Sequence, residues 1–178
     1  DPLASAKDSV NRGGCTFILN HQALTQTPNT TTLTQGSEAR RSDVIWAIVN
    51  RYYRRMTIKA VGFPIQHVGR VQGVPSLNIE KVQAEIVGST LYAGLTAFLA
   101  TRPEHDLNFS PPETLEILRL VEQHIEQRWR ALEQSFHRIA GLREAIRGMV
   151  RPGELQDVLG RLDEWFTDES LRRIRCGI

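Results

Sequence analysis

The pattern of apolar and polar positions predicts one long helix between residues 110 and 149. Its start, Ser110-Pro111-Pro112-Glu113, has a hydroxyl for the cap, prolines where no amide hydrogen is needed, and a glutamate three residues after the cap. Apolar residues then recur every seventh position, each followed by another three or four residues later. The two sets are Leu118, Ile125, Leu132, Ile139 and Ile146, and Val121, Trp129, Phe136, Leu142 and Met149. Because the other positions are mostly Glu, Gln, Arg or His, we expect an amphipathic helix with one apolar stripe.

A second helix is predicted over residues 37–56, beginning at Ser37-Glu38. Apolar residues recur there at steps of four and would form one face of the helix: Val44, Ile45, Ile48, Val49, Tyr52, Tyr53 and Met56. Arg40, Arg51, Arg54 and Arg55 fall on the other side of the helical wheel. We therefore expect an amphipathic helix with an arginine-rich outer surface.

A third helix is predicted from the Asn78 cap to about Thr101. The second half of this segment is apolar nearly all round, with Gly, Ala and Ser between larger Leu, Tyr and Phe residues. A helix without a polar side is usually buried, and small residues let another helix approach closely. We expect this helix to form the centre of the core.

The remaining segments complete a mainly α fold with a minor β element. After Pro152-Gly153, residues 155–166 predict a short amphipathic helix that folds back antiparallel, and Thr167 caps a last turn or two. Residues 57–77 combine apolar residues with Gly and Pro, which indicates one or two short strands or a hairpin. We predict an antiparallel helical bundle built on the long helix, with residues 1–36 as an N-terminal arm and polar loop and residues 37–178 as a single helical domain.

The charge is unevenly distributed along the chain. Arginine outnumbers lysine 19 to 3, although the net charge is only +2. Residues 1–75 carry nine Lys/Arg and four Asp/Glu, a net charge of +5, whereas residues 76–178 carry thirteen and sixteen, a net charge of −3. This asymmetry suits either a polyanionic partner or head-to-tail packing of copies.

The Arg-Tyr-Tyr-Arg-Arg run at residues 51–55 is the candidate site. Guanidinium groups bind phosphates, and aromatic rings beside them can stack bases. We expect a groove that neutralises phosphates without reading sequence, with Tyr52 or Tyr53 stacking if exposed. Its candidate cations are Arg40, Arg41, Arg51, Arg54, Arg55, Lys59 and Arg70. The alternative is that both tyrosines belong to the core face and the arginines only solvate the outer face, as in any amphipathic helix.

No catalytic or cofactor-binding pattern stands out in the chain. It contains no Gly-x-Ser-x-Gly turn, and its five histidines lack metal-ligand spacing. The two cysteines, Cys15 and Cys176, are too few for a disulfide scaffold, and we expect free thiols. We therefore predict a protein that is not an enzyme and that has no metal or cofactor.

Two functions remain. The first is a self-assembling structural protein, of the viral coat or nucleocapsid type, that forms homo-oligomers and binds RNA or single-stranded nucleic acid without sequence specificity. The alternative is a helical interaction module or scaffold that presents the apolar stripe of residues 115–149 to a protein partner. No signal peptide is recognisable, and the least charged run, residues 86–101, is too short to span a bilayer. We expect a location in the cytoplasm or within a virion.

Overall fold

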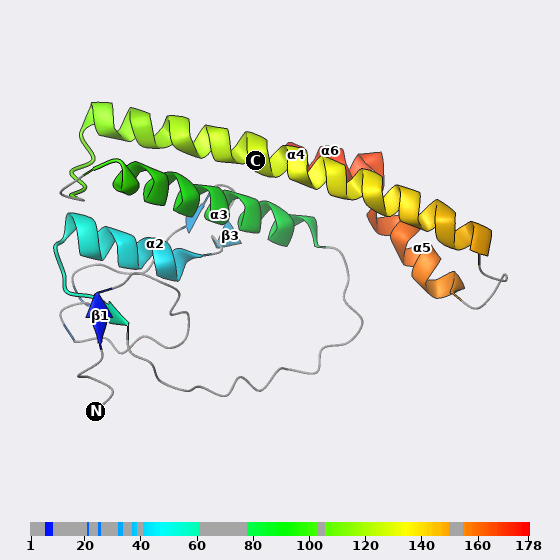
Figure 1. Cartoon of the computed structure of the whole chain (residues 1–178), viewed down its shortest axis with the longest axis horizontal. Helices are drawn as coiled ribbons and strands as arrows, with labels where there is room; N and C mark the ends of the chain where they lie inside the picture. Colours follow the sequence, from blue (N-terminus) through cyan, green and yellow to red (C-terminus); the bar gives the residue numbers. More distant parts are fainter. Residues whose placement is uncertain are drawn as a thin grey trace.

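The computed structural model describes residues 6–8, 21, 25, 32–33, 37–38, 41–60, 78–102, 106–149 and 155–178. The described part of the chain is mainly helical, as the sequence predicts (Figure 1). Its helices are α2 (Ser42–Ile48), the π-helix η3 (Val49–Tyr53), α3 (Ile79–Ala100), α4 (Pro111–Met149), α5 (Gln156–Trp165) and α6 (Asp168–Arg175). Its strands have two residues each, namely β1 (Lys7–Asp8), β2 (Thr32–Leu33), β3 (Ser37–Glu38) and β4 (Lys59–Ala60).

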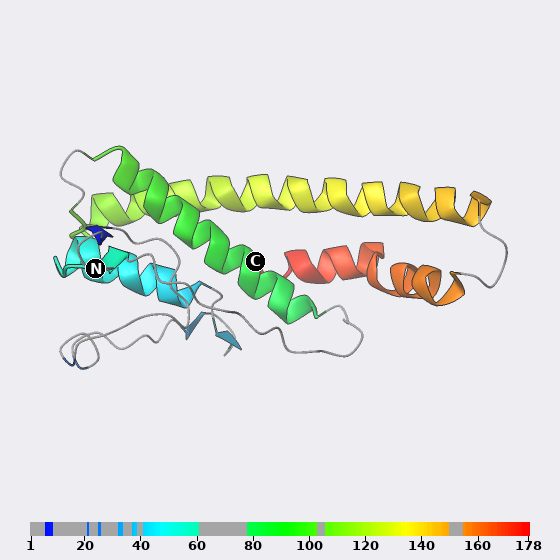
Figure 2. The same cartoon turned by 60° about the horizontal axis from the view of Figure 1, so that its bottom comes forward.

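The helices are arranged along α4. The chain reverses between α3 and α4, so that the two run antiparallel, and α2 packs on α3 (Figure 1). Helices α5 and α6 then return along the second half of α4, and α6 reaches the beginning of α3 (Figure 2). There the side-chain amide of Gln83 donates to the backbone oxygen of Arg173 at 2.8 Å.

The starts of α3 and α6 confirm the predicted caps. The Asn78 side chain accepts a hydrogen bond from the backbone N–H of Lys81 at 2.7 Å. The Thr167 hydroxyl accepts one from the N–H of Ser170 at 3.0 Å. Each cap satisfies one of the amide groups that have no partner inside the first helical turn.

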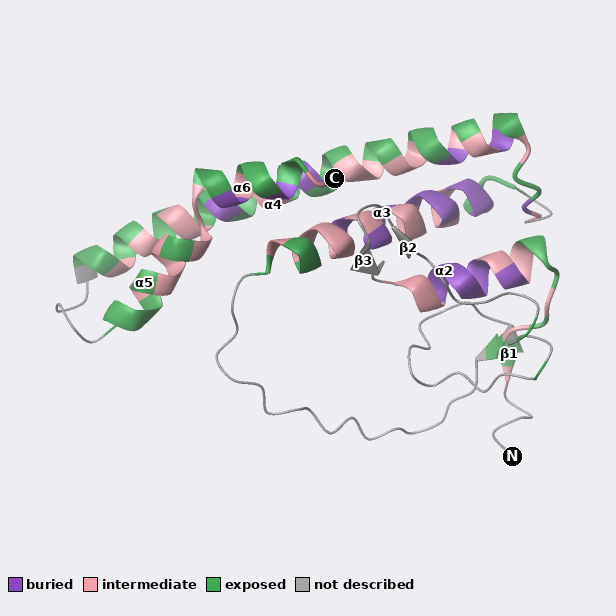
Figure 3. Cartoon of the chain, turned by 180° about the vertical axis from the view of Figure 1, so that it is seen from behind, coloured by how far each residue is buried: buried purple, intermediate pink, exposed green. Residues whose placement is uncertain are grey.

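Two clusters of buried side chains hold the helices together. The first joins α2, α3 and the beginning of α4, and consists of Val44, Ile45, Ile48, Leu95, Phe98, Leu99, Leu107 and Ile117. The second joins the start of α3 to the middle of α4 and to α6, through Ile86, Trp129, Phe136 and Ile174. Figure 3 shows the buried residues on the faces where these helices meet, whereas the outer side of α4 is exposed. The prediction that α3 forms the centre of the core is confirmed, because α3 contributes to both clusters.

Two members of the predicted α4 stripe do not lie in the core. Leu118 is 49% exposed and Leu142 is 57% exposed, whereas Ile117, which the stripe omits, is buried. The neighbours of α4 change along its length, from α2 and α3 at its start to α6 and α5 further on. The buried face therefore rotates around α4, and a strict seven-residue repeat cannot follow it.

The predicted helix over residues 37–56 is shorter than expected. Ser37 and Glu38 form β3, which pairs antiparallel with β2, and the helix begins only at Ser42. The reason is the backbone of Arg41, whose φ of 69° is left-handed and cannot continue a right-handed helix. The last turns, Val49–Tyr53, are π-helical, and Met56 lies beyond the helix.

The described part of the predicted strand region pairs with the N-terminal arm. Lys59 and Ala60 form β4, whose partner is β1, with Lys7 opposite Ala60 and Asp8 opposite Lys59. The hairpin predicted within residues 57–77 is not shown, since residues 61–77 lie outside the described residues.

Helices α3 and α4 approach each other closely at Gly94. A Cβ at this position would lie 2.5 Å from the Val121 Cγ2 atom and 3.0 Å from the Val121 backbone nitrogen. Gly141 in α4 is the opposite case, because a Cβ there would have no neighbour within 4 Å. Of these two glycines, Gly94 is the one that helix packing requires, as expected from the small residues of α3.

We predict opposite effects for the two glycine-to-alanine substitutions. Gly94→Ala should lower the free energy of unfolding by about 1–3 kcal/mol, because the methyl group would overlap the Val121 Cγ2 atom and contact the Val121 backbone tightly. Gly141→Ala should raise it by about 0.5–1 kcal/mol, because alanine favours the helix and meets no obstacle. Urea unfolding followed by circular dichroism measures both, and equal effects would contradict the close contact at Gly94.

Candidate nucleic-acid interface

The two tyrosines of the candidate site, at the end of η3, lie in different environments. Tyr52 is half-buried and packs against the first core cluster, and its backbone oxygen accepts a hydrogen bond from the N–H of Leu107 at 3.0 Å. Tyr53 points outward and is 44% exposed. The core interpretation is therefore correct for Tyr52, and only Tyr53 offers an exposed ring.

A second aromatic residue, Phe109, lies beside Tyr53. The two ring centroids are 5.3 Å apart with an interplanar angle of 60°, and Phe109 is 41% exposed. Phe109 directly precedes the α4 cap, where an apolar side chain usually packs on the fourth residue of the helix. That residue is Thr114, which is not apolar, and its hydroxyl instead donates to the backbone oxygen of Phe109 at 3.3 Å. Phe109 is not among the site residues predicted from the sequence, although its apolar side chain at a cap position without an apolar partner is a signal for it.

The turn that presents Phe109 is held by a buried carboxylate. Glu113 is 5% exposed, and its Oε2 accepts the backbone N–H of Asn108 at 2.9 Å. The Asn108 side chain in turn accepts the N–H of Ser110 at 2.9 Å. These bonds stabilise the left-handed backbone of Phe109, whose φ is 52°, and so fix the position of its ring.

Two arginines flank the aromatic pair. The Arg54 guanidinium carbon lies 5.4 Å from the centroid of the Tyr53 ring, a cation–π distance. Arg55 has a left-handed backbone, with φ of 58°, and forms an ion pair with Asp106. We call Tyr53, Arg54, Arg55 and Phe109 the aromatic–basic patch. It combines residues from two segments more than fifty positions apart in the sequence.

Arg54 and Lys59 are two exposed cations of this region. No ion pair of Arg54 is found among the described side chains, and Lys59 lies opposite Asp8 in the β1–β4 ladder. Lys59 follows Arg54 by five residues, so the Cα atoms of the two residues are at most about 18 Å apart. Phosphates of one strand could therefore contact both cations.

The other predicted cations do not join the patch. Arg41 lies at the opposite end of α2, where its Nη2 is 2.7 Å from the Glu85 Oε1 in α3. This ion pair fastens α2 to α3. Arg51 is half-buried within η3, and Arg40 and Arg70 lie outside the described residues.

Other kinds of site receive little support from the described part of the chain. It contains no group of three His, Cys, Asp or Glu residues that could hold a metal ion. None of its helices combines the length and the apolar character that crossing a membrane requires. Cys176 is a free, exposed thiol, and Cys15 lies outside the described residues.

Comparisons of the chain with protein-family models, with curated proteins and with solved structures find no match. The geometry of the patch is therefore the basis on which we assign a function.

We predict that the Glu113 carboxylate stabilises the fold through this turn. Glu113→Ala should lower the free energy of unfolding by about 1–3 kcal/mol, because it leaves the N–H of Asn108 without its acceptor. Glu116→Ala is the matched control: it breaks only the exposed ion pair with Arg102 and should cost less than about 1 kcal/mol. Urea unfolding measures both variants, and an equal cost would show that Glu113 has no special role.

Proposed function

We propose that this protein is a non-enzymatic structural protein that self-assembles and binds single-stranded nucleic acid, RNA in particular, without sequence specificity. Its role would be that of a viral coat or nucleocapsid protein. The observation that carries this proposal is the exposed Tyr53–Phe109 ring pair with the Arg54 guanidinium beside it.

The aromatic pair favours single strands over duplexes. Tyr53 is 44% and Phe109 41% exposed, so part of each aromatic side chain is accessible and can stack on an unpaired base. Each stacked base contributes about 1–3 kcal/mol, and every base has a suitable face. Bases inside a duplex already stack on one another and are not accessible to such rings.

Arg54 of the patch and Lys59, five residues further along the chain, favour binding without sequence specificity. Arg54 and Lys59 extend into solvent from a turn and a two-residue strand, and not from a helix that could enter a groove of DNA. Such side chains neutralise phosphates wherever the strand passes, which stabilises the complex equally for all sequences.

Exposed apolar residues support self-assembly. Leu115, Leu118 and Leu142 on α4, Leu155 at the cap of α5 and Val158 within α5 are all exposed in the single chain. Leu115 and Leu118 are three residues apart on one helix and therefore lie side by side, and adjoining exposed apolar side chains are typical of faces that contact another protein molecule. Trp129 and Phe136 are instead buried within the chain itself, which weighs against the alternative in which the whole 115–149 stripe binds a partner.

We predict that the patch determines the affinity for RNA. Arg54→Glu/Lys59→Glu should weaken binding of a fluorescein-labelled oligouridine at least about tenfold at low salt, since two phosphate contacts become repulsive. Tyr53→Ala/Phe109→Ala should weaken it about tenfold through loss of stacking. Fluorescence anisotropy measures both affinities, and circular dichroism verifies that the variants are folded.

The salt dependence of the RNA affinity distinguishes the phosphate contacts from the base stacking. Each phosphate contact with a single strand contributes about 0.7 to the slope of log K against log salt concentration, so the charge reversal should reduce that slope by about 1.4. The aromatic substitutions should leave the slope unchanged.

Arg130→Glu/Arg138→Glu makes the same change of net charge on the exposed surface of α4, away from the patch. If this control weakens binding as much as Arg54→Glu/Lys59→Glu does, only the net charge matters, and the patch is rejected as the site.

A further inference from the structure

An acidic side chain touches the aromatic–basic patch. The Nη2 atom of Arg55 lies 2.5 Å from the Oδ2 atom of Asp106. The two residues are 51 positions apart in the sequence, so this ion pair is formed by the fold and not by a local pattern. A carboxylate at the edge of a site for a polyanion opposes binding, because it repels the phosphates and occupies a cation that they need.

The chain at Asp106 has an anchor of its own beside the patch. The next residue, Leu107, is 4% exposed and belongs to the first core cluster. Its backbone N–H also donates to the backbone oxygen of Tyr52 at 3.0 Å. Asp106 is therefore held next to the end of η3 by its neighbour, and the turn does not depend on the ion pair with Arg55.

The ion pair itself is open to solvent. The Arg55 side chain is 76% exposed and the Asp106 side chain 44%, and a single hydrogen bond joins them. A pair this exposed changes an equilibrium constant by less than about fivefold. A phosphate group can accept two parallel hydrogen bonds from one guanidinium. An RNA phosphate can therefore replace the Asp106 carboxylate on Arg55 at small cost.

The ion pair between Arg41 and Glu85 shows the contrasting case. The Arg41 side chain is only 24% exposed, and its Nε and Nη2 atoms both donate to the Glu85 Oε1, at 3.1 Å and 2.7 Å. That pair joins two helices and is screened by them. The pair of Arg55 with Asp106 has neither property, which favours a role in binding over a role in the fold.

We infer that Asp106 is an autoinhibitory residue of the nucleic-acid interface, which competes with RNA phosphates for Arg55. This inference rests on the proposed function and names the regulation of the same site. When RNA binds, Arg55 exchanges the carboxylate for a phosphate and joins Arg54 and Lys59 as a third phosphate contact. The affinity of each copy is lowered as a result. Weak binding by single copies suits a coat protein, because copies assembled along one strand act together.

Neutralising Asp106 tests the competition. Asp106→Asn should lower the dissociation constant for a fluorescein-labelled oligouridine about three- to fivefold at low salt, because Arg55 no longer has an anionic competitor. Asp106→Ser repeats the test without an amide. Arg55→Gln should weaken binding and reduce the slope of log K against log salt concentration by about 0.7, the contribution of one single-strand phosphate contact. Fluorescence anisotropy measures these quantities.

The double variant Arg55→Gln/Asp106→Asn shows whether Asp106 acts through Arg55. In the Arg55→Gln background, Asp106→Asn should improve the affinity less than about twofold, because the cation for which Asp106 competes is gone. Equal gains in both backgrounds would overturn the inference, since Asp106 would then act only through its charge.

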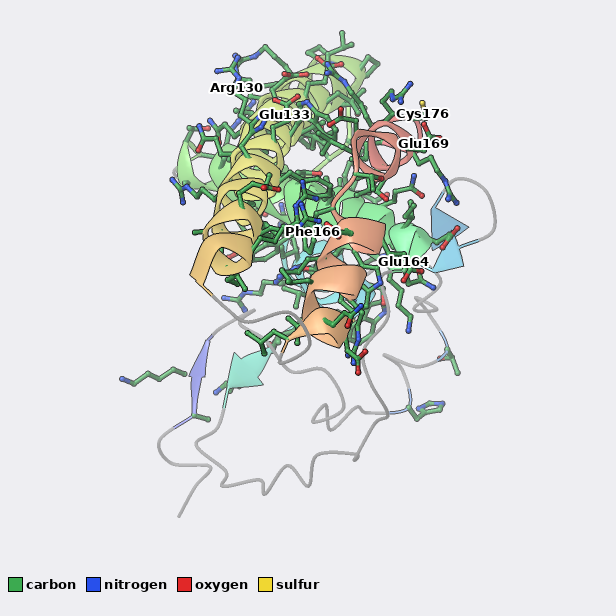
Figure 4. The ribbon with its side chains drawn as sticks, turned by 90° about the vertical axis from the view of Figure 1, so that its right-hand side faces the viewer. Arg130, Glu133, Glu164, Phe166, Glu169 and Cys176 are labelled. Carbon is green, nitrogen blue, oxygen red and sulfur yellow. The ribbon has the colours of Figure 1, made fainter. Side chains whose placement is uncertain are left out.

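Glu169→Gln is the matched control. Glu169 of α6 pairs with Arg172 at 3.3 Å, and both side chains are exposed (Figure 4, where Glu169 is labelled). Helix α6 packs on the middle of α4, whereas the patch lies just before the start of α4. The substitution changes the net charge as Asp106→Asn does and should leave the RNA affinity unchanged. A gain equal to that of Asp106→Asn would mean that only net charge matters, and would reject the competition.

The outcomes separate this inference from the proposed function. If the wild type binds RNA and Arg54→Glu/Lys59→Glu does not, but neutral residues at position 106 bring no gain, the proposed function stands and the autoinhibition is overturned. If neither the wild type nor Asp106→Asn binds RNA at low salt, both are overturned. Circular dichroism and urea unfolding verify that each variant is as stable as the wild type.

Discussion

The packing of α3 against α4 at Gly94 is the contact on which the rest of the structure depends. With no side chain at this position, the backbone of α4 at Val121 approaches α3 directly. The two helices then form a common surface on which α2 packs at one end, through Ile45 and Ile48, and α6 at the other, through Ile174. A larger residue at position 94 would separate the helices and weaken both clusters together.

The same packing produces the candidate nucleic-acid interface. The chain reverses between Ala100 and Pro111, and the buried Glu113 carboxylate accepts the N–H of Asn108 just before α4. The N–H of Leu107 then bonds to the backbone oxygen of Tyr52, which joins the turn to the end of η3. The exposed rings of Tyr53 and Phe109 meet there as a consequence of the core packing, with Arg54 beside them.

The unequal lengths of the two central helices explain why apolar surface remains open. Helix α4 has 39 residues and α3 has 22, so about 25 Å of α4 extends beyond its partner. Helices α5 and α6 cover part of this extension, but they leave no residue of α5 buried. Apolar side chains therefore remain exposed on this part of the chain, in keeping with the proposed self-assembly.

The sequence by itself determined the elements whose signals are local. Asn78 and Thr167 cap their helices, and the apolar pattern between residues 110 and 149 predicts α4, because caps and helical faces depend on residues three or four positions apart. Only the tertiary structure decided which faces are buried and which charges are available. Leu118 lies outside the core since the neighbours of α4 change along its length, and Arg41 is bound by Glu85 from another helix. Phe109 joins Tyr53 across more than fifty residues of chain, a contact that no pattern along the sequence records, because it arises from how α3 and α4 pack.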